Sequence, residues 1–364
     1  MERFAFIIHP IDARRDVARK YPVARFLPVS LIEWLLQRRD PLCVAHVTGI
    51  RSKAGPEAEG WFIGCPLTPR QFLSLPLEQV YSKLVECGRI AEDLGAGIIG
   101  LGAFTSVVGD GGVTVASRLR IPVTTGNSYT VATAVQGAAR AADLMGIVLR
   151  EATVAVVGAT GSIGATCAVM LGRQAGRLML VGRDAARLEA LAERIHPSVR
   201  VPTSVATDIA AGLRDADVVV TVSSAAEAIV LPHHIKRGAV VCDVARPRDV
   251  SVAVARERDD VLVIEGGLVR VPGAMQCTSV DTGKPFSFGF PPGTAYACMS
   301  ETMALALDGR YESFTLGKDV SVEQADEIAG LCDRHGFALG GFRSFERAVT
   351  DEEVAAIRQR AGRS

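Results

Sequence analysis

Short apolar runs alternate with amphipathic stretches over the first part of the chain. Strand-like FAFIIHP, CVAHVTGI and GIIGLG are separated by helix-like segments such as PVSLIEWLLQRR. From Leu77 to Leu94 apolar residues recur at helical spacing and Gly95 follows, which predicts an amphipathic helix packed on a sheet. The pattern predicts an α/β domain over residues 1–146. We expect this domain to bind the substrate.

From Thr153 the alternation becomes regular, with the apolar runs TVAVVG, LMLVG, DVVVTVSS, GAVVCDV and VLVIEGG. Such a series is typical of a doubly wound parallel sheet, the Rossmann fold, here expected over residues 147–290. An alanine-rich helix over about 129–146 precedes it, and we expect that helix to bridge two domains. Beyond Gly267 the sequence is rich in turns, and residues 291–364 are expected to form a C-terminal helical segment that packs back on the substrate domain.

Composition narrows the possible partners. The chain has 364 residues, 48% of them hydrophobic, with 40 Lys and Arg against 40 Asp and Glu, so no global charge attracts nucleic acid or an anionic membrane. Any such partner would need a local patch. No window reaches the roughly 18 to 20 apolar residues of a transmembrane segment, no secretory signal is seen, and the eight cysteines have no zinc or disulfide spacing, so we expect a cytoplasmic protein without metal.

Three spaced glycines follow the apolar run that begins at Thr153. Gly158 permits a tight turn, Gly161 lets the backbone approach a pyrophosphate, and Gly164 allows close packing of the next helix. Thr160, Ser162 and Ile163 complete the loop, and the helix N-terminus offers N–H groups to phosphate. This arrangement predicts dinucleotide binding, and the alternative is a merely tight strand–helix turn.

The next strand ends at Gly182-Arg183 and not at a carboxylate that would hold a ribose diol. Arg183 can stack on adenine and pair with a 2′-phosphate, and Arg187 lies one helical turn further on. The pattern therefore favours NADPH, unless both arginines face solvent and Asp184 contacts the ribose. Ser223, after the fourth strand, is expected near the nicotinamide.

Cys298 is the candidate for covalent chemistry. In the segment FPPGTAYACMSETMALALDG the sequence predicts a helix with Thr294 as N-cap and Gly309 as its stop, so Cys298 falls near the first turn. A thiolate there is stabilised by the helix dipole and can take an acyl group from a thioester. Periodicity alone favours the alternative that Cys298 is an ordinary packing residue.

The ordered stretches GIIGLGAFTSVVGD, IPVTTGNSYT, ATVAVVGATGSIGA, EGGLVR and YACMSETMALALDGR resemble the long-chain fatty acyl-[acyl-carrier-protein] reductases of the cyanobacterial, aldehyde-forming type. The resemblance covers roughly residues 80 to 340. It implies NADPH as cofactor, Cys298 of the Ala297-Cys298 pair as the nucleophile, and release of a fatty aldehyde. Its donor would be acyl carrier protein or coenzyme A thioester, and an aldehyde-consuming enzyme is a possible further partner.

Two polar loops are further candidates. The GAFTS loop supplies Thr105 and Ser106, and the TTGNS loop supplies Thr125 and Asn127. Both follow buried strands, where hydroxyl and N–H groups can form an oxyanion hole, with simple turn chemistry as the alternative. Near the N-terminus a basic cluster could meet an acidic carrier protein, although a solvated turn explains it equally; its members are Arg14, Arg15, Arg19 and Lys20.

Two other functions fit the same sequence. One is an NADP-dependent dehydrogenase of a small polar keto or hydroxy acid, which would need a lysine–aspartate pair that the sequence does not reveal. The other is a non-enzymatic protein that senses NADP by changing conformation.

Overall fold

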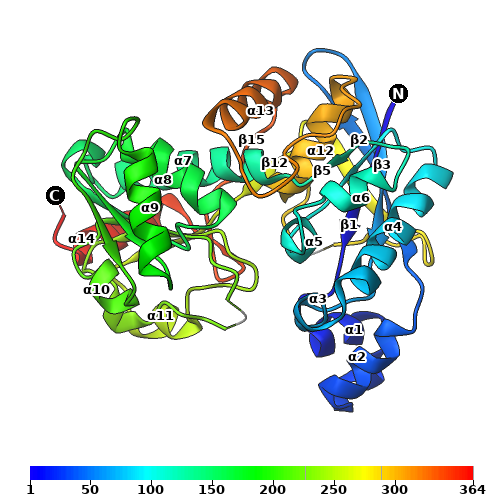
Figure 1. The fold of residues 1–364 in the computed structure, drawn as a ribbon, viewed down its shortest axis with the longest axis horizontal. Coiled ribbons are helices and arrows are strands. Elements are labelled where there is room, and N and C mark those ends of the chain that lie inside the picture. Colours follow the sequence, from blue (N-terminus) through cyan, green and yellow to red (C-terminus); the bar gives the residue numbers. More distant parts are fainter. Residues whose placement is uncertain (226, 288, 364) are drawn as a thin grey trace. The chain divides into compact units, whose positions relative to one another are not determined.

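The computed structural model describes residues 1–225, 227–287 and 289–363, and it leaves the side chains of Arg19 and Lys20 undescribed. The chain divides into two compact units, each of which is built from separate stretches of sequence (Figure 1). The first unit comprises 1–126, 270–319 and 330–338, and the second comprises 127–269, 320–329 and 339–364.

The first unit is built on a six-stranded sheet with the order β13-β2-β3-β1-β4-β5. Strands β1, β3, β4 and β5 run parallel, whereas β2 and β13 are antiparallel to their neighbours. The parallel strands therefore all end at the same edge, where the candidate cysteine lies. The strand bounds are β1 Glu2–Ile8, β2 Leu42–Arg51, β3 Glu57–Gly64, β4 Ile98–Gly100, β5 Val123–Thr124 and β13 Gly273–Ser279.

Helices flank this sheet. The predicted amphipathic helix is present as α4, Leu77–Asp93, and buries Val80, Leu84 and Cys87 against β-strand residues such as Ala5 and Ile99. The predicted stop, Gly95, follows the helix with a left-handed backbone conformation, φ +80°. The other helices are α1 Ala13–Lys20, η1 Pro22–Phe26, α2 Val29–Gln37, α3 Pro69–Ser74, α5 Phe104–Val107, α6 Val113–Ser117 and α12 Ala297–Leu307.

The second unit is a Rossmann fold, as the regular alternation predicted. Its six strands are all parallel and have the order β11-β10-β9-β6-β7-β8. This is the doubly wound order in which the first strand of the series, β6, lies at the crossover point where ligands bind. The bounds are β6 Thr153–Val157, β7 Arg177–Val181, β8 Thr203–Ala206, β9 Val218–Thr221, β10 Val240–Asp243 and β11 Leu262–Glu265.

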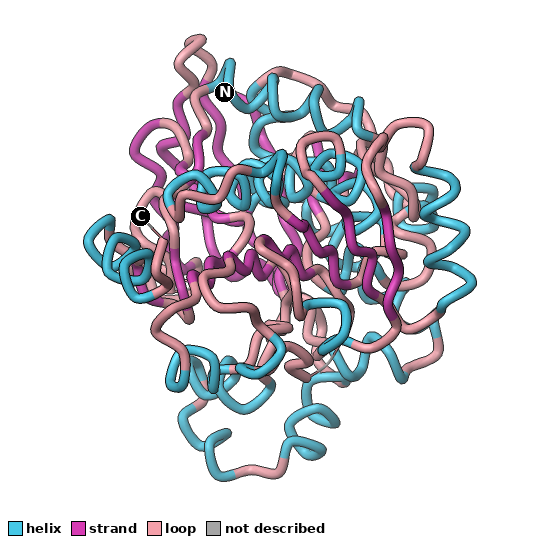
Figure 2. Tube along the Cα trace, turned by 90° about the vertical axis from the view of Figure 1, so that its left-hand side faces the viewer, coloured by secondary structure: helices cyan, strands magenta, loops and turns pink. Residues whose placement is uncertain are grey.

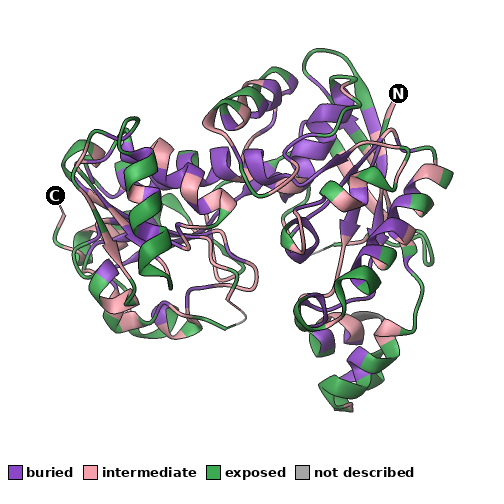
Figure 3. Cartoon of the chain, viewed as in Figure 1, coloured by how far each residue is buried: buried purple, intermediate pink, exposed green. Residues whose placement is uncertain are grey.

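Helices cover both faces of the Rossmann sheet (Figures 2 and 3), and all residues of β9, β10 and β11 are buried. Val154 of β6 packs in one apolar cluster with Ala138 of α7, and the next-but-one residue, Val156, packs with Leu188 of α9 in another. The remaining bounds are α7 Asn127–Leu144, η2 Leu149–Glu151, α8 Ser162–Gly172, α9 Ala185–Ile195, α10 Ile209–Leu213, η3 Pro232–His234, α11 Val252–Glu257, β16 Arg343–Ser344, β17 Arg347–Ala348 and α14 Asp351–Arg360.

The elements β12 Leu268–Arg270, α13 Val322–His335 and β15 Ala338–Leu339 are each divided between the two units, whereas β14 Thr294–Tyr296 lies within the first unit. The divisions differ from the expected boundaries. Helix α7 belongs to the second unit because its apolar residues pack on the Rossmann sheet, and residues 270–290 belong to the first unit because β13 pairs with β2. The segment 291–364 is shared between the units.

Two kinds of feature are absent from the described residues. No helix among them is both long enough and apolar enough to cross a membrane. Within the same residues, no group of His, Cys, Asp and Glu is arranged to hold a metal ion.

Candidate active site

The glycine loop between β6 and α8 has the geometry that phosphate binding requires. Gly158 adopts φ +79°, and a Cβ atom placed there would lie 3.0 Å from the backbone N of Ser223. A Cβ at Gly164 would lie 2.3 Å from the carbonyl oxygen of Gly158, so the helix packs directly on the loop. Gly161 is the exposed N-cap of α8, which leaves the backbone open to a ligand at this helix N-terminus. Thr160, Ser162 and Ile163 are half-buried beside it.

Arg187 reaches the glycine loop from helix α9. Its Nη2 donates to the carbonyl oxygen of Thr160 over 3.4 Å. The carboxylate of Asp184 is engaged as the N-cap of the same helix, because it accepts the backbone N–H of Arg187 at 3.1 Å. Arg183 is exposed at the end of β7. The structure thus brings one of the two candidate arginines to the phosphate loop and gives Asp184 a capping role.

Ser223, the predicted nicotinamide contact, is held by an aspartate that the sequence analysis did not single out. Asp249 is fully buried and accepts the Ser223 backbone N–H at 2.9 Å and its hydroxyl at 2.5 Å. The hydroxyl of Thr221 donates to the same carboxylate. Asp249 therefore fixes the loop that follows β9. No local motif marks it, because it lies 26 residues from Ser223 in sequence.

Asp243 ends the neighbouring strand β10 and accepts backbone N–H groups from Ala245, Asp249 and Val250. Burial raises the pKa of this carboxyl to about 6, because desolvation disfavours its charged form more than the nearby Arg246 favours it. Asp243 and Asp249 together order the carboxyl ends of β9 and β10.

Cys298 lies in the first turn of α12, as predicted, although the helix begins differently. Its N-cap is Tyr296, and Thr294 lies in strand β14 with its hydroxyl donated to the carbonyl oxygen of Pro291 at 2.7 Å, so the expectation of a Thr294 cap was wrong. The predicted stop is confirmed, since Gly309 follows the helix with φ +68°. Most of α12 is buried, but Cys298 is half-buried.

Two loops of the first unit pack closely around Cys298. A Cβ placed at Gly126 would lie 2.3 Å from both Cα and Cβ of Cys298, and one placed at Gly102 would lie 3.4 Å from its Sγ. Gly102 follows β4 and Gly126 follows β5, so the thiol lies at the carboxyl edge of the parallel strands. Ala103, which follows Gly102, adopts φ +48° and is exposed. Non-glycine residues with such strained backbone conformations cluster at functional sites.

Several of the other cysteines lie in surroundings that lower their reactivity. Three of the eight cysteines, Cys43, Cys277 and Cys298, are partly accessible, and the other five are buried. Desolvation raises the pKa of Cys43 and of Cys277. Burial likewise raises the pKa of Cys167 to about 12. A raised pKa lowers the thiolate fraction and hence the reactivity.

Glu301, one helical turn after Cys298, is a buried carboxylate that the sequence analysis missed. It accepts hydrogen bonds from the hydroxyls of Thr124 and Thr315. Because Thr124 ends β5, this network fastens the start of α12 to the strand edge that carries Gly126. In the sequence, Glu301 could have been noticed as a charged residue within an otherwise apolar helical stripe.

The predicted oxyanion-hole residues are brought to the same edge, but three of their hydroxyls already donate hydrogen bonds to backbone carbonyl groups. Thr105 donates to the carbonyl oxygen of Gly102 at 2.8 Å, Ser106 to that of Ala103 at 2.8 Å, and Thr125 to that of Thr315 at 2.5 Å. The turn-chemistry alternative therefore describes the hydroxyls of Thr105 and Ser106, whereas that of Thr125 bonds to a distant part of the sequence. Asn127 is buried at the first position of α7.

His9, directly after β1, is a further polar group at this edge. Its Nδ1 lies 3.1 Å from the carbonyl oxygen of Pro10, and since a carbonyl only accepts, Nδ1 carries the proton. Burial lowers the pKa of His9 to about 4, so the ring is neutral and Nε2 is an acceptor. Nε2 is buried without a partner, and the ring packs edge-on against Phe72 and Phe104 at centroid distances of 5.0 and 6.3 Å.

Lysine–aspartate pairs of the kind needed for keto-acid reduction are not found at these edges among the described residues. Lys236 and Asp217 form one pair at 2.7 Å, but Asp217 precedes β9 and therefore lies at the amino edge of the Rossmann sheet. Lys83 pairs with Asp40, whose side chain is 94% exposed.

Comparisons with known proteins agree with this fold. The family model for shikimate / quinate 5-dehydrogenase matches residues 140–265. The chain is 28% identical to aminotransferase PigE from Serratia sp. over 98% of its own length but only 42% of that protein. It is 27% identical to the long-chain acyl-[acyl-carrier-protein] reductase of Synechococcus elongatus over 90% of its own length and 95% of that protein.

Solved structures resemble the chain only weakly. Glutamyl-tRNA reductase from Methanopyrus kandleri is 15% identical with a TM-score of 0.31, covering 80% of this chain and 60% of that one. The iminosuccinate reductase of Paracoccus denitrificans is 18% identical with a TM-score of 0.26, covering 34% of this chain and 40% of that one. The sequence matches and the Rossmann topology together support an NAD(P)-dependent oxidoreductase of the reductase or dehydrogenase type.

Proposed function

We propose that the protein reduces a fatty acyl thioester to a fatty aldehyde with NADPH, through an acyl group carried on Cys298. The observation that carries the proposal is the placement of this thiol: it is half-buried in the first turn of α12, at the carboxyl edge of four parallel strands, with two glycine loops packed around it. The similarity in sequence to the acyl-[acyl-carrier-protein] reductase supports the choice of substrate.

In the first step Cys298 Sγ attacks the thioester carbonyl carbon. A new C–S bond forms to Cys298, the bond to the donor's sulfur breaks, and the departing thiol takes up the proton that Cys298 loses. The helix dipole stabilises the thiolate that attacks. The neutral Nε2 of His9 is an acceptor at the same strand edge, and we assign it to an N–H or O–H group of the acyl donor.

The second step needs a hydride at the carbonyl carbon of the acyl group, and NADPH would supply it when bound. The bond to Cys298 Sγ then breaks, the sulfur recovers a proton, and the aldehyde is released. The glycine loop, with Gly158, Gly161 and Gly164, would hold the pyrophosphate, while Arg183 and Arg187 would meet the 2′-phosphate. The buried pair Ser223–Asp249 would position the nicotinamide end.

Replacing the nucleophile tests the proposal. Cys298→Ala is expected to lose aldehyde formation from an acyl thioester by at least a hundredfold while NADPH still binds, as fluorescence titration would show. Cys277→Ala is the matched control, since that thiol is also half-buried and desolvation raises its pKa, which lowers its reactivity. Full aldehyde formation by Cys298→Ala would eliminate the covalent route and favour direct reduction.

A further inference from the structure

An outward apolar surface lies on the helices that follow β1. Helix α2 has two apolar faces. Its inner face buries Ile32, and Glu33 on the same side accepts the hydroxyl of Thr68 at 2.9 Å, which fastens α2 to the capping residue of α3. Leu31, Trp34 and Leu35 recur at helical spacing on the opposite face and are 40%, 50% and 43% exposed.

The preceding turn also exposes large apolar side chains. Phe26 is 85% exposed, Val23 62% and Tyr21 52%. These helices have only a small core of their own, made by Ala13, Ala18, Ala24 and Ile32, and the outer residues lie outside it. We call these outer residues the N-terminal apolar surface: Tyr21, Val23, Phe26, Leu31, Trp34 and Leu35.

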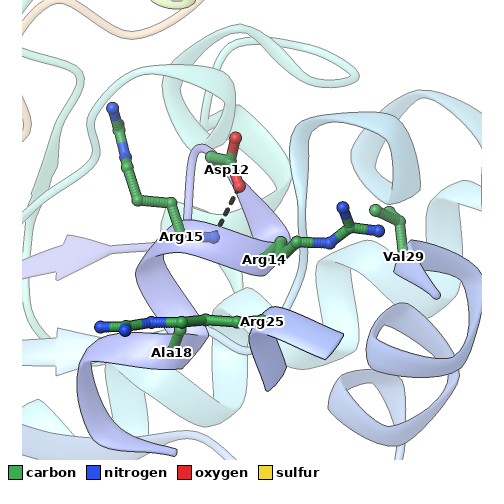
Figure 4. Close-up of a pocket in the computed structure, with 6 residues that line it drawn as sticks. All are labelled: Asp12, Arg14, Arg15, Ala18, Arg25 and Val29. Atoms are coloured by element: carbon green, nitrogen blue, oxygen red, sulfur yellow. Dashed lines mark hydrogen bonds between the residues drawn. The ribbon is translucent and has the colours of Figure 1, made fainter. Parts of the chain in front are cut away.

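Arginines border this surface. Arg14, Arg25 and Arg39 are exposed, and no ion pair with a carboxylate is seen for them in the part of the chain that the structure describes. Arg38 lies with its guanidinium 3.8 Å above the ring of Trp34. A cavity of about 490 Å³ between α1, η1 and α2 is lined by Arg14, Arg15 and Arg25 with Asp12, Ala18 and Val29 (Figure 4).

The three guanidinium groups around this cavity point in different directions and do not converge on one point (Figure 4). That arrangement suits anionic groups spread over a plane better than one bound anion. Large aromatic and aliphatic side chains on short helices, bordered by arginines, are the combination that binds the interface of an anionic bilayer.

We propose that the N-terminal apolar surface docks on an anionic lipid membrane, with Phe26 and Trp34 entering the headgroup region and the bordering arginines meeting lipid phosphates. Acidic exposed residues are few on these helices, where Asp12 is used as the N-cap of α1 and Arg15 pairs with Asp16. The charge of this surface is thus complementary to an anionic one. The inference does not depend on the chemistry proposed for Cys298.

Vesicle co-sedimentation of the full chain tests the proposal, using phosphatidylcholine vesicles with and without one quarter phosphatidylglycerol. Binding at least tenfold stronger to the anionic vesicles, and weakened by salt, is expected. The double variant Phe26→Ser, Trp34→Ser should lower it at least tenfold, as should Arg14→Gln, Arg25→Gln. Matched controls on the second unit, Val148→Ser, Val252→Ser and Arg194→Gln, Arg200→Gln, should bind like the parent protein.

A second measurement leaves the surface intact. The chain has two tryptophans, so Trp61→Phe leaves Trp34 as the only one, and its fluorescence should be quenched by brominated lipid in anionic vesicles. Absence of vesicle binding and of quenching overturns the proposal. So does an effect of the Phe26 and Trp34 changes only on dimerisation, or only on binding of an acidic carrier protein, because the surface would then serve a protein partner.

Discussion

Gly126 leaves no room for a side chain against Cys298: a Cβ at Gly126 would lie 2.3 Å from Cα and Cβ of the cysteine. Gly126 also has φ +73°, a conformation that glycine adopts without strain. The thiol's position therefore depends on a glycine in another part of the sequence, at the end of β5.

This contact makes Gly126→Ala a test of how precisely Cys298 must be placed. The added methyl group has to push backbone atoms of α12, so we expect kcat/KM for the acyl thioester to fall at least tenfold while NADPH affinity changes less than twofold. Gly293→Ala is a matched control, since Gly293 has the same φ of +73° but no atom within 4 Å of an added Cβ. Equal losses in both variants would show that backbone strain and not contact with Cys298 is responsible.

Cofactor preference depends on the arginines near the glycine loop. Arg187→Ala should raise the KM for NADPH about tenfold, or roughly 1.4 kcal/mol, and hardly change that for NADH, because a 2′-phosphate would lose a charged hydrogen bond. Steady-state kinetics with both cofactors measures this. Arg194→Ala, on the same helix but without a contact to the loop, is the control. A parallel rise of both KM values would mean that Arg187 supports the loop and does not read the phosphate.

Asp249 is expected to act by positioning Ser223. In Asp249→Asn one carboxylate oxygen becomes an amide NH₂, which cannot accept the hydrogen bond that Ser223 donates to that oxygen, so the free energy of unfolding should fall by roughly 1 to 3 kcal/mol. The KM for NADPH should rise as well, whereas the rate of Cys298 acylation should not change. Denaturant unfolding and single-turnover acylation separate these effects. A slower acylation would contradict a role confined to the cofactor side.

His9 predicts how stability depends on pH. Its pKa is lowered to about 4 in the folded chain against about 6.5 when unfolded, so the unfolded state binds more protons between these values. Stability is therefore lost as pH falls from about 6.5 to about 4, by up to roughly 3 kcal/mol. Asp243, with its pKa raised to about 6, acts in the opposite sense, since its buried neutral form gains as pH falls through 6.

The variant His9→Phe separates the two groups, because it keeps Asp243 and preserves an aromatic ring beside Phe72 and Phe104. Urea unfolding at pH 7 and pH 4.5 should show a smaller loss of stability in the variant than in the parent protein. The same loss in both would contradict a buried neutral His9.

Local patterns predicted the Rossmann unit well, because each of its strands and helices is a short segment whose partners are neighbours in a repeating order. The glycine loop lies between a strand and the N-terminus of a helix, as predicted. Strand pairing between distant segments could not be predicted from local patterns. Strand β13 pairs with β2 across more than 200 residues, so the turn-rich stretch after Gly267 was not recognised as containing a strand. Asp249 and Glu301 were missed for the same reason, since their partners lie elsewhere in the sequence.

The start of α12 shows a different limit. Thr294 is a good capping residue and follows a Pro-Gly turn, but its hydroxyl is used by Pro291 and the helix begins only at Ala297. Sequence propensity located the helix and placed Cys298 in its first turn. It could not show the glycine of another loop against the thiol.

The central claim is that Cys298 accepts an acyl group, and intact mass spectrometry tests it most directly. Protein mixed with a long-chain acyl thioester in the absence of NADPH should gain the mass of one acyl group, mapped to Cys298 by peptide analysis and discharged as aldehyde when NADPH is added. An unmodified protein that nevertheless forms aldehyde once NADPH is present, or an adduct on another cysteine, would contradict the account.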